Sequence, residues 1–145
     1  MKIVVIDGKG GRLGGEIVAM VKANFKSVAV YGIGTNGIAT SQMMKCGADF
    51  GATGENSVVV NCRDAKIVIA PIGAVVADSF IGEVTAKMAV AVGESAAVKI
   101  FIPNNQCNHY IVGVKEMTIQ ESILAVKEKI TQILNSNQNC SEDTL

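Results

Sequence analysis

Short apolar runs recur along the chain, and stretches with helical spacing lie between them. The runs lie at residues 2–7, 27–33, 48–52, 66–70 and 98–102, and most are rich in valine and isoleucine. Continuous apolar runs of this length, followed by glycine or proline, are typical of strands buried on both faces of a parallel sheet. A further run at residues 110–114 predicts a shorter sixth strand.

The intervals between these runs predict helices. Residues 12–25 place their apolar side chains on one stripe, and residues 38–45 predict a short helix that stops at a glycine. Residues 73–82 and 85–92 predict two helical pieces. Residues 55–65 fit a strand by their valine content and a crossover helix by their position, and we predict the helix.

The end of the chain divides into a strong helix and a polar tail. Thr118 and Glu121 have the spacing of a capping box, and the helix that follows keeps its apolar period to Leu134. Residues 135–145 are rich in Asn, Ser and acidic side chains without a period, which predicts a disordered tail.

Strands that alternate with helices predict an α/β fold. We expect a single Rossmann-like domain over residues 1–134, built on a doubly wound, mostly parallel sheet of five to six strands with helices on both faces. In such a fold, ligands bind where the strands end, so the residues that follow each strand are the candidates for a site.

The composition of the chain limits the kinds of partner and cellular location that we expect for the protein. Of 145 residues, 49% are hydrophobic, and 13 Lys and Arg balance 13 Asp and Glu, so the chain lacks the basic excess of a nucleic-acid binder. No run is long enough to cross a membrane, and the first residues have the pattern of a strand, so we expect no secretory signal. The four cysteines form no C-x-x-C pair, which favours reduced thiols in the cytoplasm. An apolar chain without net charge predicts a homodimer or a larger homo-oligomer.

A glycine-rich turn follows the first predicted strand. Glycines at 8, 11 and 14 form G-x-x-G-x-x-G, and a helix follows at once. Such a turn aims backbone N–H groups and the positive end of the helix dipole at an anion. The predicted binding residues here are Gly8, Gly10, Gly11, Arg12 and Leu13, with Gly11 the most sensitive to substitution. The alternative is a tight turn that binds nothing.

The later strand ends are also small or amide-rich. They add Gly34, Thr35, Asn36, Thr53, Asn56, Gly73 and Asn104 to the predicted binding residues. NAD or NADP is a candidate cofactor, because a G-x-G-x-x-G run also begins at Gly32. Against it, the end of the second strand carries no acid for the ribose hydroxyls and no Arg for a 2′-phosphate.

Catalytic chemistry finds little support in the sequence. Cys107 and His109 have no further ligand at a metal-site spacing and no orienting group for nucleophilic catalysis, so we predict no metal site and identify no catalytic residue. Asp7 is expected to accept hydrogen bonds from its own loop. Asp78 and Glu83 are too far apart around a helix to act together.

Two resemblances accompany these patterns. The glycine turn resembles that of extended short-chain dehydrogenases, but the Tyr-x-x-x-Lys pair that this would imply is absent. The stretches IDGKGGRLGG, GTNGIATSQMMKCGADFGATGEN, APIGAVVADSFIGE and IFIPNNQCNHYIVGV resemble an uncharacterised family of short bacterial proteins, domain of unknown function 3842. The second resemblance implies a bacterial cytoplasmic protein and assigns no activity.

Three functions remain open at this stage. The first is binding of a nucleotide or an NAD(P)-like dinucleotide at the carboxyl edge of the sheet, with or without a reaction. The alternative is a non-catalytic, oligomeric binding or accessory protein for a small phosphate- or carboxylate-bearing metabolite. The third is a flavodoxin-like flavin protein. The chain has only four Phe, two Tyr and no Trp, and this small number of aromatic rings that could stack on a flavin counts against it.

Overall fold

The computed structural model describes residues 1–103 and 108–142, with side chains to Asn137. Strands and helices alternate as predicted. The elements are β1 (Lys2–Asp7), α1 (Arg12–Asn24), β2 (Ala29–Gly34), α2 (Gly37–Lys45), β3 (Phe50–Thr53), α3 (Glu55–Cys62), β4 (Ile67–Pro71), the 3-10 helix η1 (Ile72–Val75), α4 (Ala86–Glu94), β5 (Val98–Ile102) and α5 (Ile119–Glu142).

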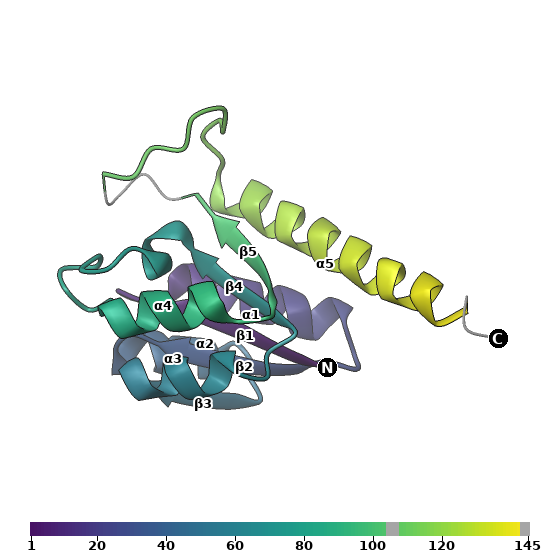
Figure 1. Ribbon diagram of the computed structural model, residues 1–145, viewed down its shortest axis with the longest axis horizontal. Helices are drawn as coiled ribbons and strands as arrows, with labels where there is room; N and C mark the ends of the chain where they lie inside the picture. The colour runs from purple at the N-terminus through teal and green to yellow at the C-terminus, as the bar shows by residue number, and fades with distance from the viewer. Residues whose placement is uncertain (104–107, 143–145) are drawn as a thin grey trace.

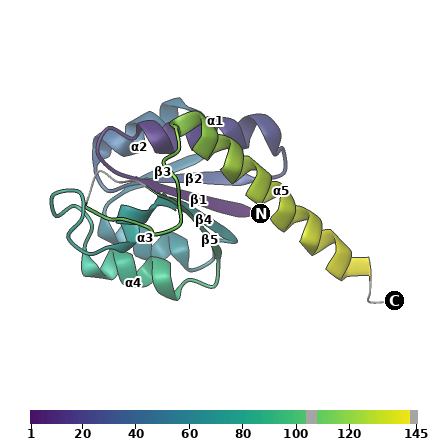
Figure 2. The same cartoon turned by 90° about the horizontal axis from the view of Figure 1, so that it is seen from above.

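The strands form one parallel sheet in the order β3-β2-β1-β4-β5. Figures 1 and 2 show α1, α2 and α5 on one face and α3 and α4 on the other. The predicted doubly wound, Rossmann-like α/β fold is confirmed. Since the chain runs outward from β1 to β3 and then returns to β4, the order reverses between β1 and β4.

The core lies on both faces of the two central strands. Ile3 and Val5 of β1 pack toward α1 and α5, and the alternate residues Val4 and Ile6 pack toward α3 and α4. All four are buried, and burying a side chain of this size stabilises the fold by about 1.5–3 kcal/mol. The two-sided burial explains why β1 is a continuous apolar run in the sequence.

The helix predicted over residues 55–65 is present as α3 and ends three residues earlier, at Cys62, whereas the helix predicted over residues 73–82 is wrong. There, η1 is followed by an irregular loop of residues 76–85, the β4–α4 loop, in which Asp78, Phe80 and Ile81 have positive φ. The Phe80 ring turns inward and is buried above Gly73. Tertiary packing of this ring therefore overrides the local helical pattern.

The sixth strand predicted at residues 110–114 is also absent. The amide of Val114 donates to the carbonyl of Ile111 at 3.3 Å, and Gly113 between them has a φ of 85°, so the backbone turns there. Tyr110 and Val112 are 78% and 99% exposed. Without a neighbouring strand, the apolar pattern of this segment does not produce a ladder.

The capping box at the start of α5 is confirmed. The amide of Thr118 donates to Glu121 Oε2 at 2.7 Å, and the amide of Glu121 donates to Thr118 Oγ1 at 3.2 Å. Val126 and Ile130 of α5 are buried in the α1 face of the core. Beyond them the helix leaves the body of the molecule, as Figures 1 and 2 show, and continues past Leu134 to Glu142. It thus includes most of the stretch that was expected to be a disordered tail, while residues 143–145 lie outside the described residues.

Removal of residues 135–145 should leave the melting temperature almost unchanged. Among the described side chains of α5, which end at Asn137, Ile133 and Leu134 are the last that pack against the core, and residues 135–137 are exposed. A truncation after Leu134 is to be compared by thermal melting with one after Ser122, which also removes Val126 and Ile130. The second should melt well below the first, and a large loss in the first would show that the tail contacts the fold.

Candidate functional site

A pocket of about 360 Å³ opens where the order of the strands reverses. In open α/β sheets this reversal leaves a crevice beyond the strand ends, which is the usual place for a ligand. We call this pocket the anion pocket. It is lined by Asp7, Gly8, Lys9, Gly10, Gly11, Arg12, Leu13, Phe80, Ile102, Pro103, Met117, Ile119 and Ser122.

Two glycines of the turn make room for other parts of the protein. A Cβ on Gly11, whose φ is 71°, would stand 2.6 Å from Ala39 Cα in α2. A Cβ on Gly8 would stand 2.6 Å from both Phe80 Cδ2 and Thr35 Oγ1. Gly10, in contrast, is exposed and has nothing within 4 Å of the position of a Cβ. Gly10 is therefore the glycine of the turn that faces open space.

The carboxylate of Asp7 holds the backbone of the glycine turn in place. Its carboxylate is 6% exposed and accepts hydrogen bonds from the amides of Gly8 at 2.8 Å and Gly14 at 2.7 Å. Burial raises the pKa of Asp7 above its ordinary value, while the two amides and the nearby charge of Lys9 oppose the rise. The predicted role of Asp7, accepting hydrogen bonds from its own loop, is confirmed.

The start of α1 presents uncapped amides to the anion pocket. Gly11 is the N-cap and supplies no side-chain hydrogen bond, and the first turn carries no acid. Within residues 1–103 and 108–142, no hydrogen-bond acceptor is found for the amides of Gly10, Arg12 and Leu13. Lys9 and Arg12 add positive charge, and Arg12 Nε lies 3.3 Å from Glu16 Oε1. Amides, helix dipole and cations thus favour an anion at one place.

An acidic side chain from another part of the chain binds the residues that follow β2. Glu83, in the β4–α4 loop, accepts a hydrogen bond from Thr35 Oγ1 at 2.6 Å and two from Asn36 Nδ2 at 3.1 and 3.2 Å. Asn36 also caps α2 by accepting from the amide of Ala39 at 2.9 Å. A carboxylate therefore occupies the position where the sequence of β2 itself has none. It is bound to protein groups there, and it does not line the anion pocket.

The remaining predicted residues lie apart from this pocket. Thr53 Oγ1 is 2.6 Å from Thr40 Oγ1, and Asn56 lines a separate groove between α3 and α4. Gly73 lies under the Phe80 ring, and Asn104 lies outside the described residues. The pocket thus brings together Gly8, Gly10, Gly11, Arg12 and Leu13, and does not include Gly34, Thr35, Asn36, Thr53, Asn56 or Gly73.

Several lining residues were missed by sequence reasoning. Ile119 and Ser122 lie in the first turns of α5 and Met117 lies just before the helix, where the capping box fixes its start. That motif marked the helix start, but nothing in it marked contact with a turn more than a hundred residues earlier in the chain. Phe80 carries no sequence signal, because its place depends on the left-handed backbone of the β4–α4 loop.

The sequence profile of one protein family, described as a domain of unknown function (DUF3842), matches residues 2–135. The chain belongs to this family. The resemblance found in the sequence is confirmed over almost the full length of the DUF3842 chain, and no curated protein matches it. One similar solved structure is described as a dodecameric FMN-dependent Ubix-like decarboxylase from Escherichia coli O157:H7. The identity is 17% and the TM-score 0.48, with 88% of this chain and 75% of that chain covered.

Two further features concern the described part of the DUF3842 chain, its potential metal ligands and the length of its helices. No group of three or more His, Cys, Asp or Glu side chains there is placed to hold a metal ion. No described helix is both long enough and apolar enough to cross a bilayer. Cys107 lies outside the described residues, so the expectation that it forms no metal site or catalytic pair with His109 stays a prediction. His109 itself has a buried Nδ1 for which the described residues supply no hydrogen-bond partner.

Proposed function

We propose that the protein binds a phosphate-bearing ligand of mononucleotide size, with the phosphate on the turn between β1 and α1. The observation that carries this proposal is the set of uncapped amides of Gly10, Arg12 and Leu13, which open into a pocket beside two cations. Backbone amides at a helix start, reinforced by Lys and Arg, are a recurrent way of holding phosphate.

The size of the anion pocket supports a mononucleotide more than a dinucleotide. Its volume of about 360 Å³ lies near the lower end of the range of about 300–1,000 Å³ for small-molecule sites. An NAD-like ligand would reach from the glycine turn toward the end of β2. Phe80 and Thr35 crowd Gly8 on that path, and Glu83 is already bound to Thr35 and Asn36. NAD or NADP would therefore have to displace the β4–α4 loop, and we expect either to bind more weakly than a mononucleotide.

A second candidate function uses the same amides for a smaller ligand. A non-catalytic, oligomeric protein that binds a small phosphate- or carboxylate-bearing metabolite needs only the turn and the two cations. The modest volume of the pocket favours this candidate as much as it favours a mononucleotide. The two are separated by calorimetry with inorganic phosphate, a dicarboxylate, AMP, FMN, NAD and NADP. Tighter binding of AMP or FMN than of phosphate supports the first candidate, and equal binding supports the second.

Replacing Gly10 with aspartate should abolish most phosphate binding without harming the fold. A Cβ at this position meets nothing, and a carboxylate before α1 favours the helix dipole by about 0.3–1 kcal/mol. The same carboxylate repels a bound phosphate, so we expect about a tenfold or greater loss of affinity, which corresponds to about 1.4 kcal/mol. Calorimetry measures the phosphate affinity of the variant, and thermal melting measures its stability.

The matched control is Gly37→Asp at the start of α2. It changes the net charge equally and also has open space around the new Cβ, but it does not line the anion pocket. Phosphate affinity should stay within about twofold of wild type, which is a small free-energy change. Equal losses in both variants would contradict a site at the glycine turn, and absence of any binding by wild type would end the proposal.

We also expect a homodimer or a larger homo-oligomer. Several apolar side chains at the molecular surface have little cover, among them Ile81, Tyr110 and Val112, which are 103%, 78% and 99% exposed. Where such side chains gather into a contiguous patch, the patch often marks an interface with another subunit. Light scattering at micromolar concentration measures the mass, and the mass of a monomer would contradict the expectation.

A further inference from the structure

A second pocket of about 470 Å³ lies beside the anion pocket. We call it the side pocket. It lies between the β4–α4 loop and the segment that follows β5, and it is lined by Lys9, Val76, Ala77, Asp78, Ser79, Phe80, Ile81, Asn108 and His109. Lys9 and Phe80 line both pockets, so the two are neighbours across these side chains. A ligand held in one is therefore within reach of the other.

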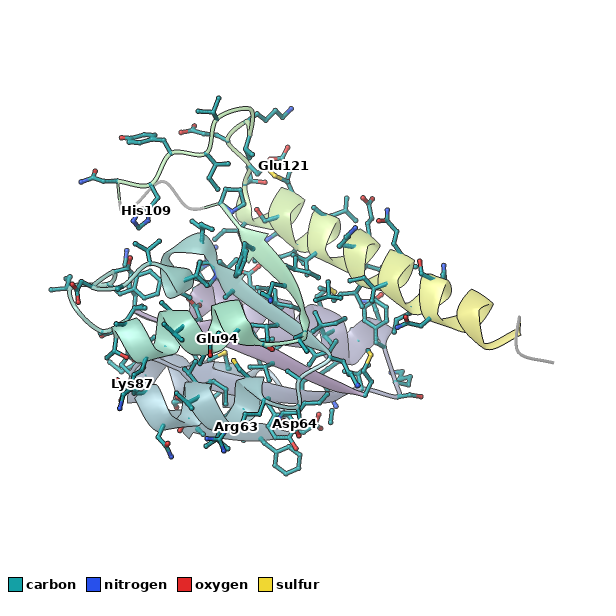
Figure 3. The ribbon with its side chains drawn as sticks, in the orientation of Figure 1. Arg63, Asp64, Lys87, Glu94, His109 and Glu121 are labelled. Atoms are coloured by element: carbon teal, nitrogen blue, oxygen red, sulfur yellow. The ribbon has the colours of Figure 1, made fainter. Side chains whose placement is uncertain are left out.

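His109 gives the side pocket a polar group whose hydrogen bonding is incomplete. Its Nδ1 is buried, and no hydrogen-bond partner is found for it among the described residues. Figure 3 shows the imidazole ring directed from the segment after β5 toward the β4–α4 loop. Buried polar atoms in native proteins are almost always paired, so this nitrogen is a place where a bound group can complete the hydrogen bonding of a residue that lines the side pocket.

The β4–α4 loop contributes a complementary set of groups. Ser79 is buried, while Asp78 is exposed, and the positive φ angles of Asp78 and Phe80 flank Ser79. The turn is fixed by hydrogen bonds from the amide of Asp78 to the carbonyl of Val84 at 2.7 Å and from the amide of Val84 to the carbonyl of Ser79 at 3.2 Å. The loop thus holds a carboxylate and a hydroxyl in the lining of the side pocket, and His109 adds an imidazole from a different segment of the chain.

These groups fit hydroxyl-bearing chemistry. A sugar hydroxyl can donate to the carboxylate of Asp78 and accept from or donate to Ser79 and His109. The apolar lining from Val76, Ala77 and Phe80 suits the carbon face of a sugar ring. Lys9, at the boundary, can stay near a phosphate in the anion pocket. The side pocket therefore matches the part of a sugar phosphate that extends away from its phosphate group.

We propose that the side pocket binds the hydroxyl-bearing sugar of a phosphorylated ligand whose phosphate lies on the glycine turn, with His109 and Ser79 as specificity-determining residues. This inference rests on the proposed phosphate site and extends it by naming the class of ligand as a sugar phosphate. It predicts that the sugar adds affinity only through the wall formed by His109 and the β4–α4 loop.

The test compares inorganic phosphate with ribose 5-phosphate by calorimetry on the full chain. Ribose 5-phosphate should bind wild type about tenfold or more tightly than phosphate. His109→Phe keeps a ring of similar size, and Ser79→Ala removes only the hydroxyl. Each should lower the affinity for ribose 5-phosphate about five- to tenfold and leave the affinity for phosphate unchanged, as expected for the loss of a hydrogen bond in a binding site. The control is Tyr110→Phe, which removes a hydroxyl from the residue next to His109 that does not line the side pocket.

A second measurement does not depend on the variants. His109 is the only histidine of the chain, so its imidazole signals in an NMR spectrum are unambiguous. Ribose 5-phosphate should shift them, and phosphate should shift them much less. If phosphate binds but the sugar adds no affinity and leaves these signals in place, the side-pocket inference is overturned and the phosphate site stands. If neither compound binds, the proposed function fails as well.

Discussion

Replacing Gly11 with alanine should destabilise the fold by about 2–4 kcal/mol, because a positive φ and a close contact act at the same position. The new Cβ would stand 2.6 Å from Ala39 Cα and 2.8 Å from the Ala39 carbonyl oxygen, and both are backbone atoms of α2 that cannot rotate away. Urea unfolding of the purified variant measures the change in the free energy of unfolding.

The control for Gly11 is Gly37→Ala. Gly37 is the first residue of α2, and nothing lies within 4 Å of the position of a Cβ. That substitution should leave stability unchanged or raise it by about 0.4–1 kcal/mol, since alanine restricts the unfolded chain. A Gly11→Ala protein as stable as wild type would show that α2 does not pack against the turn as described.

Replacing Asp7 with alanine should cost about 2–4 kcal/mol at neutral pH, because two buried amides lose their acceptor. The amides are those of Gly8 and Gly14, at 2.8 and 2.7 Å from the carboxylate. Unfolding in urea again measures the loss. A change of only a few tenths of a kcal/mol would mean that water or another group satisfies these amides.

The contribution of Asp7 to stability should change with pH in a definite direction. Because burial raises the pKa of Asp7, ionisation is less favourable in the folded chain than in the unfolded chain. The part of the stability that depends on protonation of Asp7 is complete below the ordinary value of 3.8 and is lost as the pH rises through the raised pKa, while the hydrogen bonds from the two amides remain at neutral pH. The stability advantage of wild type over Asp7→Asn should therefore shrink as the pH increases.

Asp49 should show the opposite dependence of stability on pH. Its pKa is lowered by a hydrogen bond from Lys22 Nζ at 2.8 Å and by another from the amide of Val30. The effect of Asp49→Asn should be largest at neutral pH and fade as the pH drops through the lowered pKa. If Asp7→Asn and Asp49→Asn show the same trend with pH, burial does not control Asp7.

The fold and the glycine turn of the anion pocket were predictable, because the sequence patterns that indicate them involve only neighbouring residues. The continuous apolar run of β1, the glycine turn after it and the capping box of α5 each depend on neighbouring residues, and each is present in the structure. The expectation that Asp7 accepts hydrogen bonds from its own loop was also local, since its partners lie within seven positions.

The rest of the site depends on contacts that the sequence does not encode locally. Phe80 and Glu83 reach the ends of β1 and β2 from a loop that breaks an apparent helical pattern. The expectation that Gly11 is the turn residue most sensitive for ligand binding assumed that it faces a ligand. The structure places the backbone of α2 there instead, so substitution at Gly11 tests packing, and Gly10 is the better probe of binding.

The central position of β1 has a consequence for how the chain is made. Residues 2–7 are synthesised before their partners, because Ile3 and Val5 pair with Ile67 and Ile69 of β4, and α1 is covered by Val126 and Ile130 only when α5 has been made. Pairings between such distant residues form slowly, and a nascent chain exposes its apolar faces until they do. A fragment that ends before β4 leaves one edge of β1 without its neighbour. The order of the strands therefore makes the two halves of the sheet depend on each other for folding, and neither half is expected to be made separately as a stable protein.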